Sequence, residues 1–272
     1  MTEVTTMTSS THPAYGELRP VTPLASVLLE DNPGHMTLDG TNTWLLRAPG
    51  ADGCVVVDPG EEDEPHLERV LAAAGEVALV LITHRHHDHV GGAPWLARRA
   101  GAPVRALDPA LTIDADPLAD GEEIEAAGVR LRVMATPGHT SDSVSVLVDG
   151  PDAPPAVLTG DTVLGRGTTV IAHPDGALGP YLTSLRRLAE LPAGTVALPG
   201  HGPERPDVVE AARAYLAHRE ERLDQVRGAL AVLGADATPR QVVEHVYADV
   251  DRSLWGAAEM SVRAQLAYLR ES

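Results

Sequence analysis

The feature that most constrains this chain is a group of histidines directly after a run of aliphatic residues. The stretch His84–His89 reads HRHHDH and holds four histidines and one aspartate within six residues. The preceding run, VALVLI, is apolar throughout, which is typical of a strand buried on both faces of a sheet. The histidines therefore lie on the loop that leaves the C-terminal end of that strand, where α/β folds commonly place ligand sites.

Three further stretches repeat this arrangement of a strand followed by a polar side chain beside glycine or proline. His139 lies in PGHT after VRLRVMA, Asp161 in TGDT after AVL, and His201 in PGHG after VAL. Imidazole and carboxylate groups are common ligands of zinc and related ions. Glycine lets the backbone turn sharply beside such a centre. The recurrence indicates a metal site assembled from several strand ends.

Short apolar runs bounded by glycine, proline or aspartate alternate with helical patterns over the first two thirds of the chain. We expect strands at 25–30, 42–47, 53–58, 77–84, 129–135, 143–149, 155–161 and 195–200. Helices are expected at 64–74, 93–100 and 181–191. From residue 206 the pattern becomes helical, with helices expected at 208–233, from Thr238-Pro239 onward, and at about 257–269. This order predicts an α/β fold with layered packing.

The motif set resembles that of the metallo-β-lactamase fold superfamily, over about residues 25–203. The resemblance implies an αββα sandwich with two Zn²⁺ ions per chain at one edge of the two sheets. One ion would be bound by His84, His86 and His139 and the other by Asp88, His89 and His201, with Asp161 bridging them. Asp88 and Asp161 would also act in catalysis, by orienting a water molecule and relaying its proton.

A closer similarity is to the β-lactamase-like protein 2 branch of that superfamily, through GTNTWLL, TGDTVLGRGTTVI and the helical C-terminal part. Members of that branch include an endoribonuclease that acts on single-stranded RNA, and related fungal thioesterases release polyketides from carrier proteins. The branch carries a winged-helix-like C-terminal region. Here the sequence stops at LRES, just after the last expected helix, so we expect the wing to be short or missing. We divide the chain into a flexible tail (1–20), a metallo-β-lactamase fold domain (21–205) and a helical, truncated winged-helix-like region (206–272).

The leading hypothesis for function is a hydrolase in which hydroxide bound to a dinuclear zinc site attacks a small ester, thioester or lactone. The alternatives are an endoribonuclease on single-stranded RNA and, third, an iron-dependent redox enzyme. The formal net charge of −18 and the absence of lysine disfavour a nucleic-acid partner. No apolar run reaches the ~18 residues that span a bilayer, and no signal peptide is evident, so we expect a cytoplasmic protein without a membrane partner. The C-terminal helices could act as a lid over the cleft, as the interface of a homodimer or as a nucleic-acid contact, and their apolar side could pack on this chain or on a second subunit.

Several other polar residues have both a functional and a structural interpretation. His87 is expected to be a surface or supporting group, and His173 a turn residue. Arg166 could hold a substrate anion or be a solvated loop charge, while Asn42 and Thr43 could reach the site or only stabilise turns. The remaining histidines, His12, His35, His66, His218 and His245, are expected to be surface or helix residues without partners.

Overall fold

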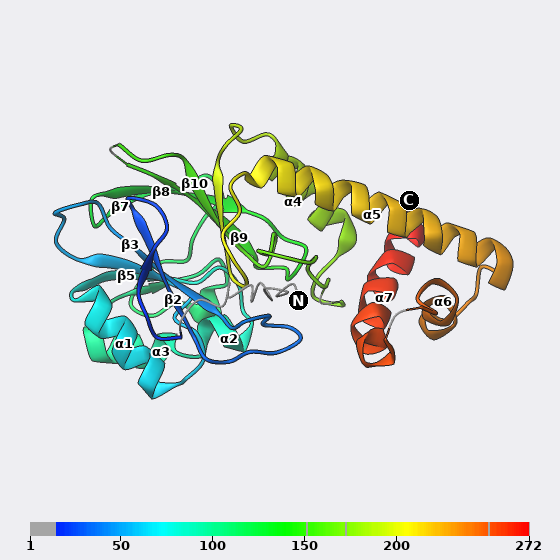
Figure 1. Ribbon diagram of the computed structural model, residues 1–272, viewed down its shortest axis with the longest axis horizontal. Coiled ribbons are helices and arrows are strands. Elements are labelled where there is room, and N and C mark those ends of the chain that lie inside the picture. Colours follow the sequence, from blue (N-terminus) through cyan, green and yellow to red (C-terminus); the bar gives the residue numbers. More distant parts are fainter. Residues whose placement is uncertain (1–14, 151, 172, 250, 272) are drawn as a thin grey trace, which may run out of the picture.

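Two β-sheets packed face to face form the centre of the molecule (Figure 1). The computed structural model describes residues 15–150, 152–171, 173–249 and 251–271. The first sheet has the order β1-β2-β3-β4-β5-β6, comprising Arg19–Pro20, Ala25–Leu29, Asn42–Leu46, Cys54–Val57, Val77–Leu81 and Val104–Arg105. The second has the order β11-β10-β9-β8-β7, comprising Val196–Pro199, Ala156–Gly160, Val144–Asp149, Val129–Ala135 and Glu123–Ala126.

Alternation of apolar and polar residues decides which face of each sheet is buried. In β8 the apolar Val129, Leu131 and Val133 are buried, while the intervening arginines are exposed. These valines and leucines contact inward-facing residues of the first sheet, Trp44 among them, and form one hydrophobic core between the sheets. Burial of apolar surface at about 25 cal/mol per Å² makes this core the main source of stability.

Helices cover the outer face of each sheet and complete four layers. The first sheet is covered by α1 (Glu64–Ala74) and α3 (Ala93–Ala100), whose apolar residues share a second core with the outward-facing residues of β4 and β5. The second sheet is covered by α4 (Leu178–Ala189) and the first half of α5 (Val208–Leu233). The predicted α/β sandwich of αββα type is therefore confirmed.

The C-terminal region is helical, as predicted. Helix α5 runs on past the sandwich, and α6 (Pro239–Val246) and α7 (Trp255–Glu271) pack against its distal half (Figure 1). Helix α6 begins with a capping box in which Thr238 and Gln241 exchange hydrogen bonds, the N-terminal signal read from the sequence. Val242, Val243 and Val262 are buried in this small core, so most of the apolar side of the C-terminal helices packs on this chain. Within the described residues, no strand follows β11.

The structure adds short elements that the sequence patterns did not predict. Strands β1 and β6 have two residues each, and β7 at the sheet edge reads EIEA, with charges on its solvent side. Helix α4 begins at Leu178 rather than Tyr181, because its proline falls in the first turn, where no helical N–H is needed. Of the predicted flexible tail, residues 1–14 lie outside the described residues, and the sheet begins within the remainder, at β1. No described helix is long and apolar enough to cross a bilayer.

Candidate metal centre

All seven side chains singled out by the motifs converge at one edge of the two sheets. The segment after β5, including the one-turn helix α2 (His87–Val90), supplies four of them, and the loops after β8, β10 and β11 supply one each. Their potential ligand atoms fall into two groups, each with all atoms within 4.8 Å of one another. The groups are His84, His86, His139 and Asp161, and then Asp88, His89 and His201. The division agrees with the two ligand sets that the family resemblance implies.

Three ring nitrogens of the first group point toward one another. His86 Nδ1 lies 3.1 Å from His84 Nε2 and 3.0 Å from His139 Nε2. Ligands at ~2.0–2.1 Å from a tetrahedral zinc ion are separated by about 3.3 Å, close to these distances. Burial is the largest cause that lowers the pKa of His84, His86 and His139, so their imidazoles are neutral at pH 7. Neutral imidazole is the form that binds metals.

The second group combines two imidazoles with a carboxylate. His201 Nε2 lies 3.1 Å from Asp88 Oδ2 and 3.2 Å from His89 Nε2. Burial alone would lower the pKa of His89, but the charges of Asp58 and Asp161 raise it to about 10. Despite its burial, His201 likewise has a raised pKa because of Asp161 and Asp88. The negative charge of these carboxylates therefore strongly favours positive charge at the position of His89 and His201.

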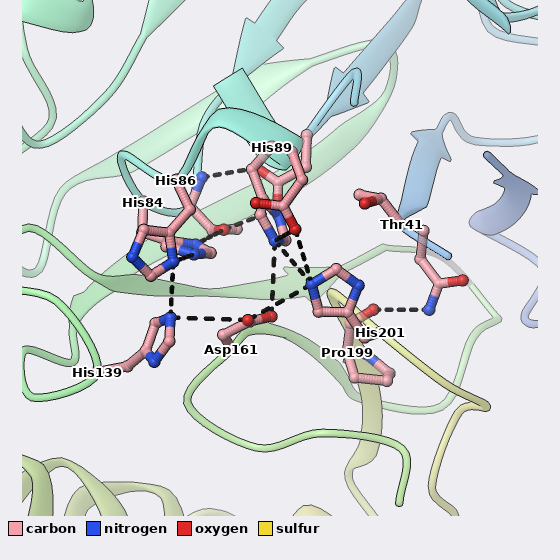
Figure 2. A network of polar contacts seen from close by, with 12 residues as sticks. Thr41, His84, His86, His89, His139, Asp161, Pro199 and His201 are labelled. Carbon is pink, nitrogen blue, oxygen red and sulfur yellow. Dashed lines mark hydrogen bonds and ion pairs between the residues drawn. The ribbon is translucent and has the colours of Figure 1, made fainter. Parts of the chain in front are cut away.

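Asp161 lies between the two groups (Figure 2). Its Oδ2 is 3.6 Å from His139 Nε2 and 3.5 Å from His201 Nε2. Its Oδ1 is buried and accepts no hydrogen bond, although buried carboxylate oxygens normally find a partner. An unsatisfied carboxylate oxygen among inward-pointing ring nitrogens fits a pair of divalent cations.

Hydrogen bonds on the far side of three of these rings keep the other nitrogen turned inward. His139 Nδ1 donates to Val170 O at 2.6 Å, and His201 Nδ1 donates to Gly40 O at 3.1 Å. His84 Nδ1 lies 3.1 Å from the Thr83 hydroxyl. Bonds of this kind select the tautomer and orientation that a metal-binding histidine needs.

Asp58 is a buried residue beside the candidate metal centre that the sequence analysis did not identify. It follows β4, is 1% exposed, and places Oδ2 2.9 Å from His89 Nδ1. The same carboxylate accepts hydrogen bonds from the backbone and the hydroxyl of Thr83. Its backbone has φ 52°, which is uncommon for a residue with a side chain. A signal was available, because Asp58 also ends a buried strand, but residues 53–58 were interpreted only as a strand.

Gly200 allows β11 to approach the centre closely. A Cβ atom at this position would lie 2.6 Å from Asp161 Oδ1 and 2.6 Å from His89 Cε1. Neither neighbour can move without displacing a potential ligand. Gly200, the first glycine of the PGHG motif, is therefore required because there is no room for a side chain, and not because of its backbone conformation.

Several other residues weighed from the sequence form hydrogen bonds or ion pairs within the fold. The Asn42 side chain donates to Pro199 O at 3.0 Å and to Gly202 O at 2.7 Å, and the Thr43 hydroxyl donates to Asp58 O at 2.9 Å. Arg166 forms an ion pair with Asp39, and His87 is exposed on α2. His173 is half-buried in the loop after β10.

The expectation for His66 was wrong in one respect. It lies on helix α1 as predicted, but it is 1% exposed, and its Nε2 is 2.9 Å from the Thr43 hydroxyl. Burial lowers its pKa to about 4, so it is a neutral hydrogen-bonding partner inside the fold. It supports Thr43, which in turn holds the backbone of Asp58.

Comparisons with known proteins agree with this architecture. Residues 36–201 match the family model described as the metallo-beta-lactamase superfamily, and residues 238–272 match the beta-lactamase associated winged helix domain. A beta-lactamase-like protein 2 homolog of Caenorhabditis elegans is 33% identical over 272 residues, covering 94% of this chain and 88% of that protein. An atrochrysone carboxyl ACP thioesterase of Aspergillus fumigatus is 31% identical over 226 residues, covering 80% and 68%. The crystal structure of a beta-lactamase domain protein from Burkholderia ambifaria has a TM-score of 0.79 at 24% identity, covering 97% of this chain and 90% of that one.

Proposed function

This chain belongs to the metallo-β-lactamase superfamily, and on that premise we propose that it is a hydrolase that uses two zinc ions to cleave a small ester, thioester or lactone. The observation that carries the proposal is the position of Asp161, whose unsatisfied buried oxygen lies between two groups of inward-pointing ligand atoms. Zinc suits a set of imidazole and carboxylate ligands, and iron or manganese is tested beside it.

We assign His84, His86 and His139 to one cation, Asp88, His89 and His201 to the other, and Asp161 to both. When bound, such a pair lowers the pKa of a water molecule enough to supply hydroxide near neutral pH. The ligand set also carries two carboxylates, which neutralise part of the cationic charge in a buried place.

Asp88 is the residue that we assign to proton transfer, together with Asp161. Burial raises the pKa of Asp88, but the hydrogen bond and charge of His201 and the charge of His89 outweigh it and hold the pKa well below the usual value. Asp88 therefore stays a carboxylate and can accept hydrogen bonds at neutral pH. Its side chain is more exposed than that of Asp161, so it is the better placed to contact an incoming water molecule.

An acyl substrate is favoured over RNA on two grounds. One relative carries the name of a carrier-protein thioesterase, and this chain covers 68% of that protein. The formal net charge of −18 opposes the approach of a polyanion such as RNA at long range. A neutral or singly charged ester does not meet that barrier.

The test compares the zinc-loaded protein with its Asp161→Ala and Asp224→Ala variants on thioesters, lactones, aryl esters and end-labelled single-stranded RNA. Asp224 is the matched control, because it is exposed on α5 and pairs with Arg227 only three residues along the helix. We expect turnover of an acyl substrate by the parent and by Asp224→Ala, and none by Asp161→Ala. Full activity in Asp161→Ala would refute the assigned centre. Metal-dependent cleavage of RNA with intact acyl substrates would replace the assignment of an acyl hydrolase with that of a ribonuclease. The same assay after loading with iron or manganese determines which metal supports turnover.

A further inference from the structure

A cavity of about 630 Å³ lies between the sandwich and the C-terminal helices. Its walls come from the loop after β2, the loop after β10, helix α5, and the segment from the end of α6 into α7. Its volume falls within the ~300–1,000 Å³ of typical small-molecule sites. A hollow of similar volume at the β7–β8 hairpin shares no residue with the metal centre.

The cavity adjoins a hollow at the metal centre. A small hollow of about 70 Å³ is lined by His139 and Asp161, and it shares His35, Met36 and the segment 168–170 with the larger cavity. A molecule whose reacting bond lies at the cations can therefore extend along these shared residues toward α7. The sequence patterns did not single out the residues of its walls, since His35 and His218 were expected to be surface or helix residues and both line the cavity.

Exposed apolar side chains concentrate on the walls of this cavity. Met36 is 51% exposed, Leu254 is 42% exposed and Met260 is 36% exposed. Among the described residues, these are three of the six large apolar side chains with exposure of this extent, and all three line the same space. Exposed apolar surface gathered beside a reactive centre indicates a binding site for an apolar group. Methionine side chains adapt to ligands of varied shape.

The charge of the walls also differs from that of the molecule as a whole. Arg219 and Arg222 line the cavity and, among the residues that the structure describes, no Asp or Glu does, although the chain carries a formal net charge of −18. Arg219 is held by a hydrogen bond to Thr169 O, and the Arg222 guanidinium lies 5.0 Å from the centre of the Tyr247 ring. The walls therefore do not repel the carboxylate that acyl hydrolysis releases.

We propose that this cavity holds the apolar acyl group of the substrate, so that the enzyme prefers thioesters and esters of long-chain or ring-bearing acids over acetyl esters. The inference rests on the proposed hydrolase function, since it assumes that the bond to be cleaved lies at the metal centre. Helix α7, which forms one wall of the cavity, then takes part in substrate selection.

Gly256 offers a variant that fills the cavity without disturbing the fold. It lines the cavity near the start of α7, and a Cβ atom built on it meets no atom within 4 Å. Gly228 is the matched control, because it is also helical, its Cβ position is equally open, and it does not line the cavity. Leucine is a better helix former than glycine, so Gly256→Leu and Gly228→Leu are both expected to fold.

The first experiment measures kcat/KM of the zinc-loaded protein for acetyl, hexanoyl and decanoyl thioesters of one small thiol. For the parent we expect kcat/KM to rise with chain length, by at most about four-fold for each methylene that becomes buried. In Gly256→Leu the value for the decanoyl thioester should fall by at least about ten-fold, while that for the acetyl thioester stays within about two-fold. Gly228→Leu should match the parent on all three.

The second experiment measures decanoate binding to the same three zinc-loaded proteins by calorimetry, which separates the two proposals. Gly256-dependent binding of decanoate without hydrolysis of any acyl substrate would remove the hydrolase function and keep the cavity as a binding site. Hydrolysis without dependence on chain length, with Gly256→Leu behaving like Gly228→Leu, would remove the cavity proposal and keep the hydrolase. A self-associated protein in which a second copy blocks decanoate binding would also overturn the cavity proposal.

Discussion

Replacement of Asp58 by asparagine tests how the structure prepares His89 as a ligand. The Asp58 carboxylate is buried and accepts three hydrogen bonds, from Thr83 N at 2.8 Å, from the Thr83 hydroxyl at 2.7 Å and from His89 Nδ1 at 2.9 Å. Asparagine keeps the first bond if its oxygen replaces Oδ1. Its amide group then faces His89 Nδ1, so a donor stands where an acceptor stood. The His89 ring must either take the other tautomer or rotate. Either change leaves no free Nε2 lone pair directed at the metal centre.

The expected loss follows from the position of Asp58 behind one ligand of one cation. Changes of this kind reduce metal affinity by about 10- to 100-fold, equivalent to about 1.4–2.8 kcal/mol. The loss should be largest for the cation assigned to Asp88, His89 and His201, because Asp58 contacts His89 directly and reaches His84 only through the Thr83 hydroxyl.

The assay is a zinc titration against a chromophoric chelator, with the metal content per chain determined by elemental analysis. Asp63→Asn is the control, because Asp63 caps helix α1 and asparagine is an equally good cap. We expect one strongly weakened and one less affected zinc in Asp58→Asn, and two unchanged zinc ions in Asp63→Asn. Two tightly bound zinc ions in Asp58→Asn would show that the carboxylate does not prepare His89.

Three further predictions concern space, charge and helix propensity. Gly200→Ala should bind less than two zinc ions per chain, because its Cβ would lie 2.6 Å from Asp161 Oδ1, and full zinc content by elemental analysis would contradict this. Burial raises the pKa of Glu30 in the folded protein to about 7. The folded state is therefore most stable, as far as Glu30 is concerned, below the pKa of Glu30 in the unfolded chain, and it loses this stability as the pH rises through 7. Glu30→Gln should therefore gain in melting temperature relative to the parent between pH 5 and pH 8, and an unchanged difference by circular dichroism would argue against this origin. Gly228→Ala should raise the free energy of unfolding by about 1 kcal/mol, because the residue is exposed within α5 and a Cβ atom there meets nothing; urea denaturation checks the sign.

The sequence was most informative where local periodicity and residue chemistry acted together. Patterns such as the period-two alternation in β8 and the continuous apolar runs in β4 and β5 were enough to predict the strands of both sheets other than β1, β6 and β7. Because ligand-type side chains followed several such strands, their meeting at one edge could also be anticipated, and the structure brings all seven together. Their roles as metal ligands remain predictions that the titrations will test.

Other features depended on contacts between distant parts of the chain. Short edge strands such as β1 form because a longer neighbour is already in place, so two residues carry no recognisable pattern of their own. His66 reads as an ordinary helix residue until the packing of α1 on the first sheet places it against Thr43. The Asp58 carboxylate contacts Thr83 and His89 only because β4 and β5 are parallel neighbours that end at the same edge of the sheet.

The cavity beside the centre is the clearest case of a feature decided by tertiary structure. Met36, the loop at 168–170, Arg219 and Met260 are separated by long stretches of sequence, and no spacing relates them. They surround one space because α7 packs against α5, which in turn packs on the second sheet. The sequence by itself determined which residues could bind metal and which segments would be strands or helices, because those properties are local. The space left for a substrate depends on how the helices pack, which is a property of the whole fold.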